Sequence, residues 1–135
     1  MKITVFGALG LSALVLIGLP AFAHHPFSSE FDPNKPVTLT GTVAKVDWAK
    51  PHAYIYLDAR NEDGKVEQWK LETASPEFLA AHRIKESAFK KGEKITVNAY
   101  MGTNESHLAS ARAVTMPSGH SMQVCDPQDD KGPAK

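Results

Sequence analysis

Cysteine is nearly absent from this sequence, in which Cys125 is the one thiol among 135 residues. A single cysteine excludes an intramolecular disulfide framework and a zinc site built on several cysteines. An excess of charge of one sign is also lacking, because 15 Lys and Arg residues balance 15 Asp and Glu residues. A strongly basic nucleic-acid binder and a polybasic membrane-surface protein are therefore disfavoured. At this length we expect one domain.

Catalytic motifs are missing as well. The sequence has no G-x-S-x-G, no H-E-x-x-H, no glycine-rich phosphate loop and no C-x-x-C. Hydrolase, kinase and dithiol-redox activities therefore have no motif to support them, and we predict no enzymatic activity. Two acids, Glu72 and Glu77, flank a predicted strand-to-helix junction, where Glu77 is better explained as a partner of the helix dipole than as a catalyst.

Long apolar runs are confined to the N-terminus. A positively charged second residue, an apolar run over residues 3–19 and the small-x-small sequence Ala21-Phe22-Ala23 follow one another. This arrangement predicts a secretory signal peptide over residues 1–23, cleaved after Ala23, and a periplasmic location. An uncleaved N-terminal anchor is the alternative. Because no second run of this kind follows, we expect no membrane span in the mature chain.

The first part of the mature sequence predicts an arm and a bent strand. Residues 24–36 are polar and rich in proline, and we expect them to form an N-terminal arm. Residues 37–43 alternate apolar and polar side chains with a period of two, which predicts a strand. The apolar parity changes after this segment, which is typical of a strongly bent strand that serves two faces, and Gly41 is the expected bend point.

Further strands and one helix complete the pattern. Alternation and turn residues predict strands over residues 53–58, 66–72, 95–99, 108–116 and 120–124, with a second helical turn at 86–89. Ser75, Pro76 and Glu77 form a helix start, with a capping hydroxyl, proline at the first helical position and an acid in the first turn. The order β-β-β-α-β-β is that of the OB barrel. We predict a mainly β fold: a small OB-like barrel of five to six strands over residues 37–125, with one short helix between strands three and four, then a disordered tail at 126–135. A small SH3-like barrel is the alternative.

A set of motifs runs along the mature chain to about Val114, and its most specific parts are the His24-His25 start and the Pro51-His52 pair. The other matches are Phe27, Phe31-Asp32, residues 36–43, Val46-Asp47-Trp48, Gly64-Lys65-Val66, Trp69, Glu72, Ser75-Pro76 and residues 89–93. This set resembles an uncharacterised family of exported bacterial proteins, catalogued as domain of unknown function 6152. Arg83-Ile84 departs from a Gly-Trp pair that is frequent in that family. The resemblance implies export and a small-barrel fold, and it brings no established activity.

The His24-His25 pair is a candidate metal site. Cleavage after Ala23 would make His24 the new N-terminus, whose α-amine and ring together chelate a divalent metal. Pro26 has no N–H, so ligation through successive backbone amides ends there. With His52 as a further imidazole, these residues form a copper-site hypothesis. Two solvated histidines that merely follow a cleavage site are the alternative.

Aromatic residues around the second predicted strand form a candidate ligand-binding face, made of Trp48, Tyr54, Tyr56 and Trp69. OB-type barrels bind ligands across strands two and three and the adjoining loops. Tyr54 and Tyr56 share one parity and are expected to point away from the core. Structural roles are the alternative, with the tryptophans in the core and the His52 ring hydrogen-bonded to a loop carbonyl.

Soft donors suited to Cu(I) occur in the C-terminal third, at Met101, His107, Met116, His120, Met122 and Cys125. Their spacings match no tight ligand motif, and methionine most often fills gaps in a core. A free Cys125 in an oxidising compartment is open to an intermolecular disulfide.

The function that we expect is an exported OB-like binding module, with copper as the cofactor hypothesis and a small ligand, a metal or an envelope protein as partner. The alternative is a protein-interaction or envelope-maintenance module in which the histidines are incidental. Oligosaccharide or nucleic-acid binding follows from fold analogy alone, and export and neutral charge argue against nucleic acid.

Overall fold

The strand β1 (Phe31–Asp47) runs through the middle of the sheet in the computed structural model, which describes residues 27–129. Its first part pairs with β4 (Lys94–Gly102) and its second part with β2 (Tyr54–Arg60), so one strand serves both sides of the barrel. β1 starts at Phe31, which corrects the expectation that residues 31–36 belong to an arm. These residues become a strand because β4 extends beside them, a tertiary pairing that overrides the local proline signal.

The change of apolar parity in β1 is produced by a β-bulge. The register against β2 shifts between Val43 and Lys45, so Ala44 is the extra residue. Leu39 and Val43 face the core before the bulge, and Val46 packs against the core after it. The predicted two-faced strand is confirmed, and its register shift lies at Ala44.

Gly41 lies where the backbone of β2 comes very close to β1. A Cβ atom built at Gly41 would lie 2.2 Å from the carbonyl oxygen of Asp58 on β2, far inside contact distance. Glycine is therefore required here because the neighbouring backbone comes too close for any side chain.

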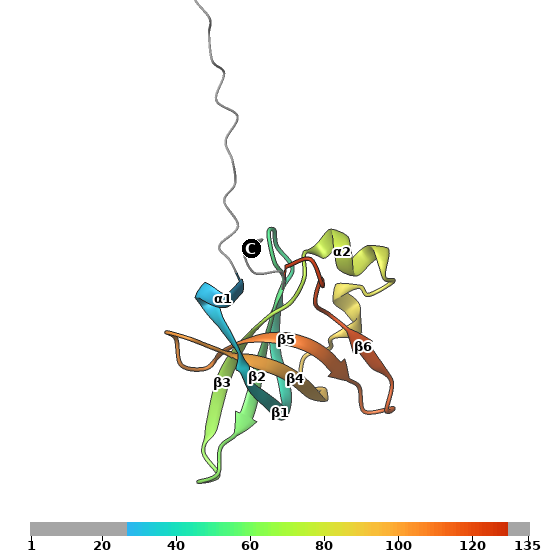
Figure 1. Cartoon of the computed structure of the whole chain (residues 1–135). Coiled ribbons are helices and arrows are strands. Elements are labelled where there is room, and N and C mark those ends of the chain that lie inside the picture. The colour runs from blue at the N-terminus through green and yellow to red at the C-terminus, as the bar shows by residue number, and fades with distance from the viewer. Residues whose placement is uncertain (1–26, 130–135) are drawn as a thin grey trace, which may run out of the picture.

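The strands close into a ring through the pairing of β3 (Val66–Glu72) with β5 (Leu108–Thr115), which is parallel. The sheet order is β3-β2-β1-β4-β5-β6, and β6 (Ser121–Gln123) lies beyond β5. The contact between β3 and β5 joins two parts of this order, so the longer strands enclose a small barrel (Figure 1). The predicted OB-like, mainly β fold is confirmed.

Short helices cover one end of the barrel. The helices α1 (Phe27–Glu30) and α2 (Pro76–Ala81) lie at the same end, which is at the top of Figure 1, and the 3-10 turn η1 (Glu86–Ala88) leads from α2 to β4. The predicted cap of α2 is confirmed, since the Phe78 N–H donates to Ser75 Oγ at 3.2 Å. At the opposite end, β2 and β3 are joined by the predicted turn over residues 61–64.

The barrel interior is filled by apolar side chains that alternate with outward polar residues. The largest of its side chains at 0–1% exposure are Ile55, Leu57, Leu71, Leu79, Ile95, Val97, Val114 and Val124. Every strand of the ring contributes to this single cluster, which is the pattern expected for a closed small barrel. Among residues 27–129, no helix has the length and apolar character needed to cross a bilayer.

Candidate functional site

His52 lies in the loop between β1 and β2, where its ring orientation is fixed. Nδ1 lies 3.0 Å from the carbonyl oxygen of Thr73, which is the contact with a loop carbonyl that the structural alternative predicts. Because a carbonyl oxygen only accepts, Nδ1 is the donor, and in the neutral ring Nε2 carries the lone pair. Nε2 lies 3.7 Å from Oε1 of Glu72, and both side chains are mostly buried, with 19% and 15% exposed.

A backbone clamp holds this histidine in place. The Thr73 N–H donates to the Ala53 carbonyl at 2.9 Å, and the buried Thr73 hydroxyl donates to the same oxygen at 3.0 Å. The Ala53 N–H in turn donates to the Ala74 carbonyl at 3.2 Å. The loop that carries His52 is thereby tied to the segment between β3 and α2.

A small pocket, which we call the upper pocket, lies beside His52 and Glu72 with a volume of about 20 Å³. This is room for one water-sized group or one metal ion. Five parts of the chain meet here: the β1–β2 loop, the end of β3 with the residues after it, β5, Phe27 of α1, and the segment after β6 with Cys125 and Asp129.

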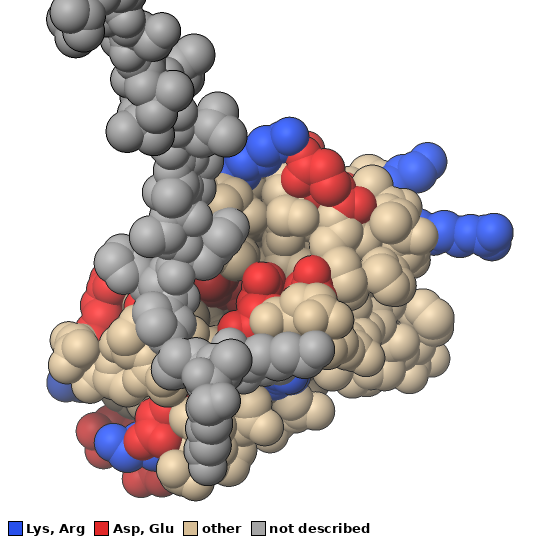
Figure 2. All heavy atoms as spheres, turned by 45° about the horizontal axis from the view of Figure 1, so that its top comes forward, with Lys and Arg blue, Asp and Glu red and all other residues tan. Residues whose placement is uncertain are grey.

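The upper pocket is acidic. Burial raises the pKa of Glu72 above its usual value, and the nearby carboxylates of Glu30 and Asp129 raise it further, whereas His52 and the Tyr54 hydroxyl lower it. Figure 2, which looks onto the α1 end of the barrel, shows acidic side chains gathered on this face. A cation would therefore be favoured here over an anion.

The segment after β6 differs from the disordered tail that we expected from residue 126 onward. The Ala74 N–H donates to the Val124 carbonyl at 2.7 Å, and the Asp129 N–H donates to the Asp126 carbonyl at 3.0 Å. Residues 126–129 thus form a turn against the upper pocket, because the β3–α2 segment anchors them. Cys125, expected near a tail, is buried, and Gln123 Nε2 donates to its Sγ at 3.6 Å.

Of the four residues in the predicted aromatic face, only the two tyrosines lie together on the outer surface. Tyr54 and Tyr56 lie on the outer surface of β2, with the Lys70 ammonium 4.4 Å from the first ring and the Lys45 ammonium 4.3 Å from the second. The Tyr54 hydroxyl donates to Glu72 Oε2 at 3.2 Å. Burial, together with the Glu72 charge, raises the pKa of Tyr54 above its usual value.

The two tryptophans do not belong to that face. Trp69 is 8% exposed and lies in the core, with its ring edge-on to His107 at 5.1 Å. Trp48 packs against the core beside Phe89, with the ring centroids 6.5 Å apart. Trp69 has the inward parity of its partner Leu57, so strand register explains why it leaves the tyrosine face.

The soft donors of the C-terminal third do not form one cluster. Met101 and His107 flank the start of β5, and Met116 and His120 follow its end. Eight residues of strand span about 26 Å, so the two groups are far apart. Met101, Met116 and Met122 pack against the core, as gap-filling methionines do.

The structure brings His52 to an acidic pocket, and His24 and His25 lie outside the described residues. Within residues 27–129, no three His, Cys, Asp or Glu side chains are arranged to hold a metal ion. The sequence analysis did not identify Asp126 and Asp129, which line the upper pocket. The sequence around these two residues holds no local signal for that position. Nor did the sequence connect Glu72 to His52, a contact that depends on how β2 and β3 pair.

The chain matches a family model, described as a family of unknown function (DUF6152), over residues 13–110. It therefore belongs to this family, as its motifs suggested. No curated protein and no solved structure matches it.

Proposed function

We propose that this member of the DUF6152 family is exported, is cleaved after Ala23, and serves as an envelope binding module that takes up a transition-metal ion, with Cu(II) as the preferred ion. The ligands would be the α-amine and ring of His24, the ring of His25 and Nε2 of His52. The observation that carries the proposal is the hydrogen bond from His52 Nδ1 to the Thr73 carbonyl, at 3.0 Å.

This hydrogen bond is the arrangement that metal-binding histidines use. A ligating imidazole commonly donates its other ring N–H to a carbonyl or carboxylate, which fixes the tautomer and aims the remaining nitrogen. In His52 the nitrogen so aimed is Nε2, which lies 3.7 Å from a Glu72 oxygen. A bound cation would gain from this carboxylate, and its charge would favour the ionised form of Glu72 against the effect of burial.

Chain length supports the participation of the two N-terminal histidines. Phe27 lines the upper pocket together with His52 and Glu72. His24 precedes Phe27 by three residues, a span of at most about 10 Å. In a chain that begins at His24, the segment before Phe27 is therefore long enough for the α-amine to reach the upper pocket beside His52.

The test begins with the N-terminus of the exported protein, determined by mass spectrometry, which we expect to be His24. Cu(II) is then titrated calorimetrically into protein that begins at His24 and into the same protein with its α-amine acetylated. We expect acetylation to weaken binding at least tenfold, because it removes the six-membered chelate that the amine and the ring Nδ1 of His24 form with the metal. Equal affinities would refute the amine chelate and favour the protein-interaction alternative.

A histidine pair provides a matched control. His52→Gln should weaken Cu(II) binding by about tenfold or more. His82→Gln should not, although His82 Nδ1 also lies close to a backbone carbonyl, that of Phe78, at 2.8 Å. His82 is exposed at the end of α2 and does not line the upper pocket. Equal losses in the two variants would contradict a specific role for His52.

A further inference from the structure

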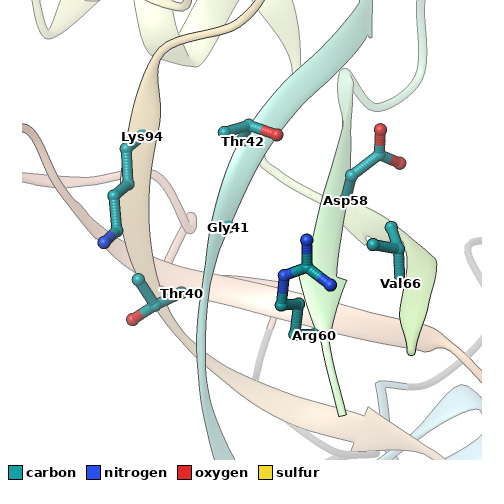
Figure 3. A pocket seen from close by; sticks show the side chains of 7 residues that line it. All are labelled: Thr40, Gly41, Thr42, Asp58, Arg60, Val66 and Lys94. Carbon is teal, nitrogen blue, oxygen red and sulfur yellow. The ribbon is translucent and has the colours of Figure 1, made fainter. Parts of the chain in front are cut away.

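The barrel carries a second concavity at the end away from α1, on the outer surface where β1 crosses between β4 and β2. This groove, which we call the hairpin groove, has a volume of about 490 Å³, within the range of small-molecule sites. It is lined by residues 40–42 of β1, Asp58 and Arg60 of β2, Val66 of β3 and Lys94 of β4. Figure 3 shows Lys94 on one side of β1 and the β2 and β3 side chains on the other.

Strand register explains why these side chains meet. Lys94 is paired with Thr42, and Thr42 with Asp58, so the three form one row across β4, β1 and β2. Arg60 is paired with Val66 in the neighbouring row. Because side chains two residues apart along a strand share a face, both rows point outward from the barrel.

The charge of the groove is positive. Arg60 and Lys94 contribute two cations and Asp58 one carboxylate, so the lining has one unit of positive charge in excess. No carboxylate of the described chain lies within ion-pair distance of Lys94 or of Arg60. Asp58 instead accepts a hydrogen bond from Gln68 Nε2 at 3.1 Å, which directs it along the sheet.

One hydrogen bond holds the Arg60 side chain in position and leaves most N–H groups of its guanidinium for other partners. Nη1 donates to the Gly64 carbonyl at 2.8 Å, which fixes the side chain against the turn between β2 and β3. A guanidinium has five N–H donors in a planar fork suited to a carboxylate. Figure 3 shows the guanidinium beside β2, in the space between β2 and β1, so its other donors lie on the groove side.

The groove also has an apolar wall and hydroxyl groups. Val66, at 57% exposure, is the one large hydrophobic side chain exposed in the described part of the chain. The Thr42 hydroxyl is directed toward β2 (Figure 3), and Thr40, on the Lys94 side of β1, has its Oγ1 hydrogen-bonded to Thr96 Oγ1 at 3.0 Å. Cations, hydroxyls and one apolar side chain together suit an anion that carries an apolar group.

We infer that the hairpin groove is a second binding site, for a monoanionic carboxylate with a short apolar chain. The carboxylate lies against the Arg60 guanidinium, with Lys94 on the other side of β1 as a second positive charge, and the apolar chain lies on Val66. The charge excess of one unit matches a single carboxylate. This inference does not depend on the metal proposal, because the two sites share no residue.

The test is a titration followed by two-dimensional ¹H–¹⁵N NMR, with hexanoate as the probe at low ionic strength. Hexan-1-ol and hexylammonium serve as uncharged and cationic probes of the same length. We expect hexanoate to shift the amide signals of residues 40–42, Arg60 and Lys94, and the other two probes to shift them far less. Equal shifts from all three probes, or hexanoate shifts confined to other residues, would overturn the inference.

Matched variants separate charge from structure. Arg60→Gln and Lys94→Gln should each weaken hexanoate binding by roughly three- to tenfold, and Arg60→Lys should restore part of the loss. Lys85→Gln, which removes an exposed charge near η1, should have no effect. Val66→Thr should weaken hexanoate binding and leave acetate binding unchanged. Retained hexanoate affinity in the Arg60→Gln, Lys94→Gln double variant would refute the site.

Discussion

The two ends of this barrel offer opposite chemistry and are built in different ways. The upper pocket is small, largely buried and acidic, and segments far apart in the sequence meet to form it. The hairpin groove is large, exposed and positively charged, and it is made by side chains on adjacent, registered strands. One sheet thus carries concavities of either charge, depending on whether loops close over its end or leave its surface open.

This difference has consequences for stability. A site made by converging loops depends on a few buried hydrogen bonds, whereas a site on a sheet surface depends on the strands that support it. Substitutions in the strand framework should therefore cost the most, those in the upper clamp less, and those in exposed ion pairs least.

The largest effect is expected from Gly41→Ala, beneath the hairpin groove. The new Cβ would lie 2.2 Å from the Asp58 carbonyl oxygen, so β1 and β2 would have to separate. We expect a loss of about 3 kcal/mol in the free energy of unfolding, measured by urea denaturation.

Gly64→Ala provides the comparison for that variant. Gly64 has φ of 79° but nothing within 4 Å of a Cβ, so only backbone strain arises, at about 1 kcal/mol. A loss in Gly41→Ala no larger than in Gly64→Ala would contradict the close approach of the strands.

A smaller effect is expected from Thr73→Val in the clamp of the upper pocket. The hydroxyl donates to the Ala53 carbonyl at 3.0 Å, and the Thr73 N–H still serves that oxygen in the variant. We expect a loss of about 1 kcal/mol in unfolding free energy, together with a shifted NMR signal of the His52 ring. Thr38→Val, whose hydroxyl bonds the exposed Asn98, is the control and should cost less. An unmoved His52 signal would show that the clamp does not position the ring.

Glu72→Gln should stabilise the metal-free protein in a pH-dependent way. Since burial raises the pKa of Glu72 in the folded state above its reference value of 4.5, the unfolded chain releases this proton first as pH rises, and stability falls. At pH 7 the variant should therefore melt at a higher temperature than the parent, and at pH 4, where most of the unfolded chain also carries this proton, the difference should be much smaller. Calorimetry with a chelator present measures the melting temperatures of parent and variant at the two pH values. An equal gain at the two pH values would exclude ionisation as the cause.

The smallest effect is expected at the ion pair between Lys50 and Glu77, which joins the β1–β2 loop to α2. Both side chains are exposed, at 76% and 54%, so solvent screens their attraction. Lys50→Ala should change the unfolding free energy by less than about 0.5 kcal/mol, as measured by urea denaturation at low and high salt. A larger loss would mean that the Lys50–Glu77 pair stabilises the fold more than a solvent-screened ion pair should.

The local parts of the fold were predictable because they depend on neighbouring residues. Alternation in residues 66–72, the Ser75-Pro76 helix start and the turn over residues 61–64 were found as predicted. The strand at residues 31–36 was missed because only the neighbouring β4 makes it a strand. The turn at residues 126–129 was missed for the same reason, since its anchor lies on Ala74.

For the candidate sites the division is similar. Parity identified Tyr54 and Tyr56 as outward, and the residue type identified His52, because periodicity and side-chain chemistry are properties of the sequence itself. Only the tertiary structure decided that His52 lies against Glu72, that Trp69 is in the core, and that Arg60 and Lys94 flank one groove. Those outcomes depend on which strands pair and in what register. Pairing and register are set by many contacts between residues far apart in the sequence, so no local sequence pattern predicts them.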